Sequence, residues 1–77
     1  NASKEKAPKA ATPRTKGVPF LPEGYNKVYN DNDEIWLDGI FKKGNLWEGK
    51  VYEYDKDGIL LKVKVFKEGV YHSDGQL

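Results

Sequence analysis

The only histidine of the chain, His72, is followed directly by Ser73 and Asp74, so the three residue types of a hydrolytic triad stand side by side. A triad works only when the serine hydroxyl, the imidazole and the orienting carboxylate converge in space. Successive residues of a β-strand point to opposite faces of the sheet, so these three side chains diverge. We therefore predict that they are surface residues without a catalytic role.

Two acidic segments carry oxygen ligands of the kind that Ca²⁺ prefers, residues 30–34 (NDNDE) and residues 55–58 (DKDG). A calcium-binding loop of the EF-hand type also needs a bidentate Glu at a fixed distance after its Gly. Lys64 stands at that distance after Gly58, so the pattern fails. A zinc site needs more imidazole or thiolate than one His and no Cys provide. We predict that both segments are turns and that the chain holds no metal.

Carboxylate pairs for hydrolysis could be drawn from Asp38, Glu48 and Glu53. Such pairs act in a concave site that surrounds the substrate. A flat β-module of this size offers no predictable cleft. We therefore predict that the chain is not an enzyme, with no catalytic residue and no cofactor.

The elements that carry these residues are predicted to be β-strands. In residues 59–67 an apolar set alternates with a mixed set, which indicates a strand with one buried face. The apolar set is Ile59, Leu61, Val63 and Val65, and the mixed set is Leu60, Lys62, Lys64 and Phe66. Residues 34–42 and 46–54 show similar strand signals, and Gly39 marks a bulge or a close backbone approach. We predict strands near these three ranges and no helix longer than one turn after residue 25.

The turns between these strands repeat with a period of 25 residues. The matched pairs are 29–32 (YNDN) with 54–57 (YDKD) and 41–44 (FKKG) with 66–69 (FKEG). Asp33 takes the place of Gly58, and Asp is among the few residues that tolerate a positive φ. Residues 27–51 and 52–76 are therefore predicted to be two copies of one β-hairpin unit in an antiparallel meander.

The segment from Gly39 to Tyr54, GIFKKGNLWEGKVYEY, resembles the MORN-type repeat and is most similar to the bacterial variant of the YwqK antitoxin family. The shared pattern is a Gly, an aromatic, a basic residue and a Gly, followed by a Glu-Gly-Lys, an aromatic strand, an acidic turn with Gly and a Leu-Lys strand. Residues 57–62 (DGILLK) fit the last piece, and the resemblance covers roughly residues 33–76.

Two departures from this pattern are visible. Asp33 stands where the family has a turn Gly, and the second copy ends in HSDG at residues 72–75 rather than in Glu-Gly-Lys. The last unit is thus expected to be a terminal, capping one. The resemblance implies an open β-meander at residues 25–77 that serves as an interaction scaffold, with an antitoxin-like binder as the alternative.

We predict that residues 1–24 are an extended, basic and proline-rich N-terminal arm. Residues 1–22 hold all four prolines and one of the ten aromatics. They also hold five basic residues and one acidic residue, so their net charge is +4, against −3 for the rest of the chain. So little apolar surface cannot offset the entropy of ordering the segment. We predict that the arm is disordered when free and orders only against a partner.

Five residues are the predicted contacts with a partner. Val18, Phe20 and Leu21 form an apolar, stiff part of the arm that loses little entropy on docking, with a plain linker as the alternative. Trp36 and Trp47 are added because a thin meander cannot hide all of its aromatics behind one core face, and exposed aromatics are common at binding hot spots. Core packing is the alternative for both tryptophans.

A marginal core, an extended arm and open hairpin edges indicate a non-catalytic protein-interaction or scaffold module. An accessory subunit of a larger assembly, for example in the cell envelope, is the expected role. The lysines of the arm allow contact with nucleic acid phosphates or with an anionic surface. The arm lacks interleaved aromatics for base stacking, so a protein partner is favoured over nucleic acid.

The sequence leaves the compartment open. No apolar run approaches the roughly 18 residues of a membrane span, so no span is predicted. The chain begins at Asn1 and contains no Met, so we expect a processed product or a fragment whose targeting segment lies outside this sequence. A bacterial periplasmic, envelope or exported location is favoured over the cytoplasm.

Overall fold

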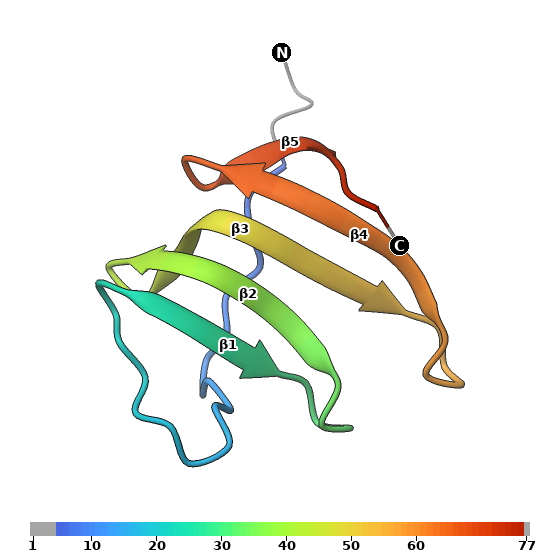
Figure 1. Ribbon diagram of the computed structural model, residues 1–77, viewed down its shortest axis with the longest axis horizontal. Helices are drawn as coiled ribbons and strands as arrows, with labels where there is room; N and C mark the ends of the chain where they lie inside the picture. Colours follow the sequence, from blue (N-terminus) through green and yellow to red (C-terminus); the bar gives the residue numbers. More distant parts are fainter. Residues whose placement is uncertain (1–4, 77) are drawn as a thin grey trace.

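A computed structural model describes residues 5–76, and in this range the chain forms one antiparallel sheet of five strands without a helix (Figure 1). The strands are β1 (Tyr25–Tyr29), β2 (Ile35–Lys42), β3 (Asn45–Tyr54), β4 (Leu60–Lys67) and β5 (Val70–Asp74). Each strand pairs with the next one along the chain. The predicted all-β antiparallel meander is confirmed, and no helix of residues 5–76 is long and apolar enough to cross a membrane.

The three predicted strands correspond to β2, β3 and β4, and their ends agree to within one residue. The sequence did not predict β1 and β5, which have five residues each and lie at the two edges of the sheet. The side chains of β1 do alternate between the two faces of the sheet, because Asn26 and Val28 are buried whereas Tyr25 and Lys27 are exposed. A polar residue in one of the two buried positions conceals this alternation in the sequence.

The 25-residue repeat is present in the geometry of the turns before β2 and β4. In each turn the side-chain oxygen of the first residue, Asn30 or Asp55, accepts hydrogen bonds from the backbone amides two and four residues later. The fourth residue, Asp33 or Gly58, has a positive φ of 62° or 83°. The prediction that Asp33 takes the role of the turn glycine is therefore confirmed.

Gly58→Val is expected to lower the stability of the fold by about 2 kcal/mol, because a β-branched residue is strained at positive φ. A Cβ at this position would also lie 2.7 Å from the Glu34 Oε2 atom. Lys56→Ala, an exposed change in the same turn, is the matched control and is expected to have little effect. Thermal unfolding followed by circular dichroism measures both, and equal melting temperatures for Gly58→Val and the parent chain would show that the turn tolerates strain.

Most buried side chains gather on one face of the sheet, here called the core face. They are Val28, Leu37, Phe41, Leu46, Val51 and Phe66. The expectation for residues 59–67 is wrong in part: Ile59 and Leu61 are exposed, and Phe66 from the alternate set is fully buried. Phe66 lies opposite Gly49, where the missing side chain leaves room for the ring. Val63, also buried, faces the other side of the sheet.

Residues 5–22 of the arm cross the core face from one edge of the sheet to the other (Figure 1). Lys6 pairs with Val70 of β5, and Arg14 pairs with Tyr29 of β1, each as an isolated antiparallel bridge. Unpaired strand edges are the usual route by which sheets join other chains. The arm therefore occupies part of both outer edges.

The arm also completes the core. Ala7, Ala10 and Phe20 pack against the buried cluster, and the ring of Phe20 meets Phe41 edge-on, with the ring centroids 5.4 Å apart. The sequence predicts an arm that orders against a partner, whereas the structure places residues 5–22 against the sheet of the same chain. The physical reason is that the core face of a single sheet needs a cover, and the arm supplies one.

Polar side-chain contacts fasten residues 5–21 of the arm to the sheet. Asn26 is 5% exposed, and its amide group donates to the Leu21 carbonyl at 2.7 Å and accepts from the Leu21 amide at 2.8 Å. Lys64 contacts Glu53 at 2.9 Å and Glu5 at 3.0 Å. These two carboxylates, Glu53 before Glu5, raise the pKa of Lys64 against the opposing effect of partial burial. Glu5 and Leu21 are thus each held by a polar contact to the sheet.

Candidate functional site

The three predicted partner contacts in the arm, Val18, Phe20 and Leu21, have different environments in the structure. Val18 and Leu21 are 65% and 51% exposed. Phe20, which stands between them, packs into the core of the chain itself. Val18 and Leu21 line a hollow of about 180 Å³ together with Tyr25 and Tyr29 of β1. Val18 and Leu21 thus remain on the surface, whereas Phe20 has an intramolecular contact.

Trp36 is half-buried beside the arm. It packs against the buried cluster and lines a shallow hollow of about 290 Å³ with Ala10, Arg14 and Asp31. A register shift between β1 and β2 leaves Trp36 without a partner across the ladder. Part of the Trp36 side chain is therefore buried by core packing, the alternative to partner contact, and the rest is exposed.

Trp47 lines a hollow of about 480 Å³, which lies between the arm and the two hairpin turns at one end of the sheet; we call it the Trp47 hollow. Its apolar part is formed by Ala7, Leu46 and Trp47, and its rim by Lys6, Lys9, Lys42 and Lys43. The Lys42 ammonium lies 4.8 Å from the indole centroid, within reach of the attraction between a cation and a ring face. Trp47 therefore stands among cations.

The four rim lysines carry charge that the described residues do not neutralise. None of them takes part in an ion pair among residues 5–76. Glu68 lies in the adjacent turn, and the Glu23 carboxylate accepts a hydrogen bond from the backbone amide of Lys43. Neither glutamate lines the hollow. The rim is thus cationic over an apolar floor.

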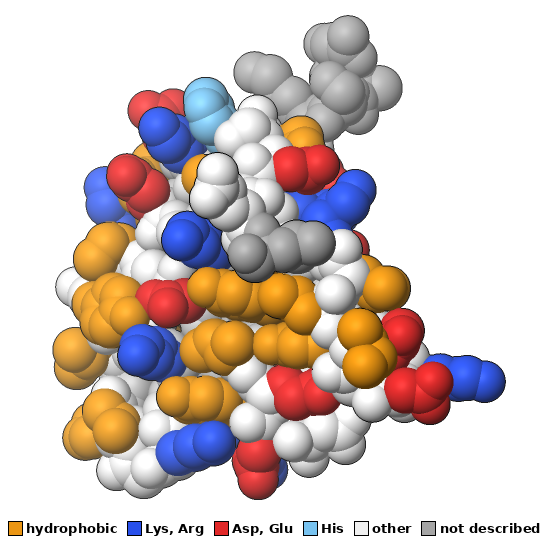
Figure 2. All heavy atoms as spheres, turned by 45° about the vertical axis from the view of Figure 1, so that its right-hand side comes forward, with side chains coloured by type: hydrophobic (Ala, Val, Ile, Leu, Met, Phe, Trp, Pro, Cys, Tyr) orange, Lys and Arg blue, Asp and Glu red, His pale blue; other side chains and the backbone are white. Residues whose placement is uncertain are grey.

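The face of the sheet opposite the arm, here called the outer face, has a mixed surface. The strand register places on it Tyr25, Lys27, Asp38, Ile40, Glu48, Lys50, Tyr52, Val63 and Val65. Figure 2 shows hydrophobic side chains in a band over the sheet, with charged side chains of both signs around it. Tyr25 and Ile40, cross-strand neighbours on this face, are 50% and 43% exposed.

A charged contact fixes the orientation of Tyr25. Its phenol donates a hydrogen bond of 2.6 Å to the Asp38 carboxylate. This hydrogen bond, followed by desolvation and the charge of Asp38, raises the pKa of Tyr25 to about 12. The pKa of Tyr54 is raised as well, mainly by burial, and that of Tyr71 by its hydrogen bond to Asp74.

Asp38→Asn is expected to return the pKa of Tyr25 from about 12 toward its ordinary value of 10.0. The folded-state pKa is raised, so the contact stabilises the fold fully below pH 10 and loses its effect as the pH rises toward 12. The ultraviolet absorbance of tyrosinate measures this titration, with Asp57→Asn in a remote turn as the control. An unchanged titration curve in Asp38→Asn would contradict the assignment.

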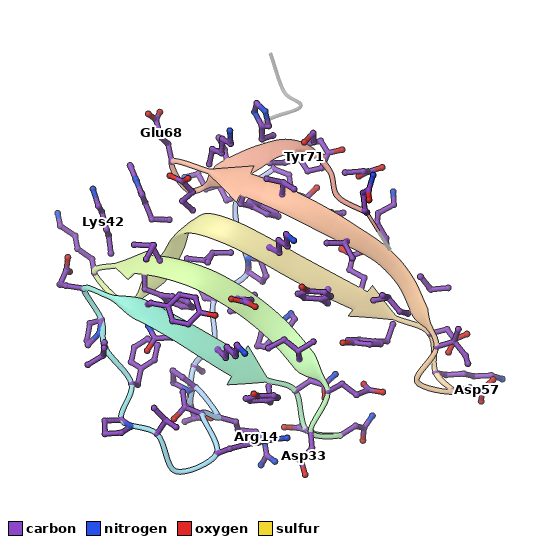
Figure 3. All side chains as sticks on the ribbon, in the orientation of Figure 1. Arg14, Asp33, Lys42, Asp57, Glu68 and Tyr71 are labelled. Carbon is purple, nitrogen blue, oxygen red and sulfur yellow. The ribbon has the colours of Figure 1, made fainter. Side chains whose placement is uncertain are left out.

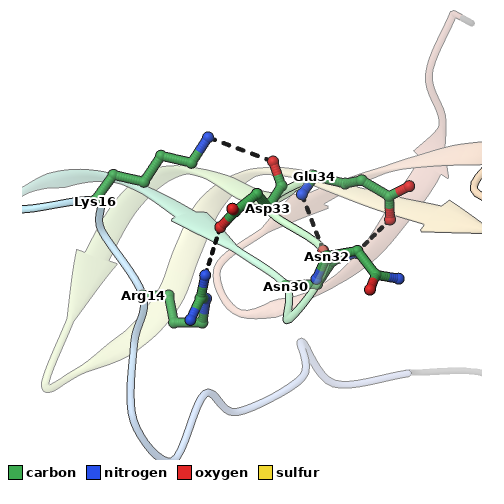
Figure 4. A network of polar contacts seen from close by, with 6 residues as sticks. All are labelled: Arg14, Lys16, Asn30, Asn32, Asp33 and Glu34. Carbon is green, nitrogen blue, oxygen red and sulfur yellow. Dashed lines mark hydrogen bonds and ion pairs between the residues drawn. The ribbon is translucent and has the colours of Figure 1, made fainter.

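The segment at residues 30–34 is engaged within the chain. Arg14 pairs with the Asp33 carboxylate, the Lys16 ammonium lies 3.4 Å from the Asp33 carbonyl, and Asn30 donates to Glu34 at 2.8 Å (Figure 4). No group of three or more possible ligands among residues 5–76 is placed to hold a metal ion. These polar groups join the arm to the turn.

The triad residues do not converge on one another. His72, Ser73 and Asp74 are exposed on β5, and Asp74 accepts a hydrogen bond of 2.9 Å from the Tyr71 hydroxyl. His72, Ser73 and Asp74 are therefore surface residues of an edge strand.

The carboxylates considered for hydrolysis lie on two faces of the sheet. Glu53 pairs with Lys64 on the core face. Asp38 and Glu48 belong to the outer face. They do not share one site.

No family model, curated protein or solved structure matches this chain. Two surfaces of the chain were not predicted from the sequence. They are the outer face around Tyr25 and Ile40, and the hollow where Lys6 and Lys9 approach Trp47. The alternation of β2 carries a signal for the first, but nothing local in the sequence could have revealed the second.

Proposed function

We propose that the chain is a non-catalytic protein-interaction module that contacts its partner through the outer face of the sheet. The observation that carries the proposal is the exposed pair Tyr25 and Ile40 on a face with a band of hydrophobic side chains (Figure 2). Aromatic and aliphatic side chains inside a polar rim are typical of the energetic centre of protein–protein interfaces.

The charges of the outer face favour a protein over a polyanion. Lys27 lies opposite Asp38, and Asp38 lies opposite Lys50 in the neighbouring strand. Nucleic acid and anionic membranes are bound by an excess of positive charge. A row that alternates in sign instead supplies paired polar contacts around an apolar centre.

The position of the arm also favours face-on contact. The bridges at Lys6 and Arg14 occupy part of the edges of β5 and β1. Addition of a partner strand at either edge would have to displace them. Among residues 5–76, no bridge to the arm other than these two edge contacts is present outside the strands.

The MORN-like interpretation remains part of this proposal. The repeated turns, with Asn30 and Asp55 in the same role, support a two-copy β-repeat. Under this interpretation the chain is a scaffold, such as an accessory subunit of a larger envelope assembly, and an antitoxin-like binder is the second candidate.

The test compares two pairs of exposed side chains. A partner that co-purifies from the native source is identified by mass spectrometry, purified, and titrated calorimetrically with both variants. Tyr25→Thr with Ile40→Thr is expected to weaken binding at least tenfold, or about 1.4 kcal/mol. Val18→Thr with Leu21→Thr, the matched change on the arm, is expected to bind as the parent chain does. If only the arm variant loses affinity, the arm and not the outer face is the binding surface.

A further inference from the structure

The Trp47 hollow has the properties of a ligand site. Its volume of about 480 Å³ lies within the range of pockets that enclose a ligand or a large side chain. Ala7, Leu46 and Trp47 give it an apolar floor. Apolar lining with a few charged groups at the rim is the usual composition of such sites.

The rim determines the charge of the ligand. Lys6 and Lys9 come from the arm, and Lys42 and Lys43 from the end of β2 and its turn. No acidic side chain lines the hollow, and none of these lysines is in an ion pair within the described part of the chain. Four like charges that converge on one hollow complement a ligand with several negative charges.

The opposite end of the sheet carries the acidic turns at residues 30–34 and 55–58. Figure 3 shows Lys42 and Glu68 at one end of the sheet, and Asp33 and Asp57 at the other. Asp31 and Asp57, which are in no ion pair among residues 5–76, disfavour a long polyanion that would extend along the sheet to these turns. This charge distribution favours a short acidic segment at one end of the sheet over a long polyanion.

The surroundings of Trp47 favour a peptide over a strand of nucleic acid. Single-stranded nucleic acid is bound by successive aromatic rings, on which its bases stack. Trp47 is the one aromatic residue among those that line this hollow, Lys42 lies over its ring, and Gly69 lies against its six-membered ring. A single ring that is partly covered provides no platform for a row of bases, whereas one apolar side chain needs only the surface of Ala7 and the uncovered part of Trp47.

We propose that the Trp47 hollow binds an acidic protein segment in which an apolar side chain is flanked by carboxylates. The apolar side chain enters over Ala7 and Trp47, and the carboxylates meet the four rim lysines. This site is separate from the outer face and does not depend on the function proposed above.

The test uses the full chain and a blocked peptide with one phenylalanine between two runs of four glutamates. The indole N–H signals of the two tryptophans in nuclear magnetic resonance spectra report binding, and Trp36→Phe assigns them. We expect the Trp47 signal to shift with saturation. Lys6→Gln with Lys9→Gln is expected to raise the Kd about tenfold, because two of the four rim charges are lost.

The controls separate the possible outcomes. Lys27→Gln with Lys50→Gln removes the same charge from the outer face and is expected to leave the Kd within twofold. An equal loss in both variants would show unspecific attraction and overturn the proposal, as would equal binding of the peptide with glutamine in place of glutamate. A tighter Kd for oligo(dT) or for phosphatidylserine vesicles, with the same shift of Trp47, would assign the site to another class of anion.

Neither rim substitution uncovers the core, because Lys6 and Lys9 are both exposed. The bridge between Lys6 and Val70 of β5 is formed by backbone groups and does not involve the Lys6 side chain. If the acidic peptide does not bind at the Trp47 hollow, the outer-face proposal still stands, because that proposal is tested with the substitutions at Tyr25 and Ile40.

Discussion

Deletion of residues 1–22 is expected to leave residues 23–77 without a cooperative fold. Ala7, Ala10 and Phe20 cover the buried cluster, and their loss would expose Phe41 and Phe66 to water. A sheet of this size has little stability in reserve, because a short chain buries a small share of its surface. We expect the fragment to show the circular dichroism of an unfolded chain and no thermal transition.

A single substitution gives a graded form of the same result. Phe20→Ala removes the edge-on contact with Phe41 and is expected to cost about 2 kcal/mol, less than a fully buried Phe because Phe20 is half-buried. Val18→Ser with Leu21→Ser changes only exposed side chains and serves as the control, with a melting temperature near that of the parent chain. A fragment 23–77 that melts cooperatively near the parent temperature would show that the arm contributes nothing to the core.

Gly39→Ala is expected to destabilise the fold by about 3 kcal/mol, at the upper end of the cost of overpacking. Gly39 lies directly opposite Gly49 in the ladder of β2 and β3. A Cβ at Gly39 would lie 2.2 Å from the Glu48 carbonyl oxygen and 2.6 Å from the Gly49 Cα atom. Both are backbone atoms that cannot rotate away, so β2 and β3 would have to separate.

Gly44→Ala is the matched control for this prediction. No atom lies within 4 Å of a Cβ at Gly44, so its cost comes only from φ, which is +80°. A left-handed backbone costs an ordinary residue about 1 kcal/mol. Urea denaturation of both variants separates steric clash from backbone strain, and equal losses would mean that β2 and β3 can move apart without penalty.

The turns and the repeat could be predicted from the sequence because their physics is local. The side chain of Asp55 reaches backbone amides only two and four residues away, and Gly58 supplies the positive φ that the same turn requires. Asp33 could be placed by its equivalence to Gly58. The close approach at Gly39 was one of two predicted options, because a glycine inside a strand usually marks a bulge or a place where two backbones come close.

The side of β4 that faces the core could not be predicted in this way. Period-two alternation shows that two faces differ, but it does not show which of them meets a covering segment. Gly49 leaves room for Phe66, and the arm then covers that face, so Leu61 remains on the surface. The choice depends on contacts between residues far apart in the chain.

The sequence by itself determined the meander, its turns and the expectation of a binding role for the exposed aromatics. Only the tertiary structure decided that the arm lies on its own sheet, that Phe20 belongs to the core, and that Lys6 and Lys9 join Trp47 at one hollow. Composition predicts whether a segment can bury enough surface to fold alone. It cannot predict that a neighbouring sheet in the same chain offers the missing surface, because that depends on where the chain returns in space.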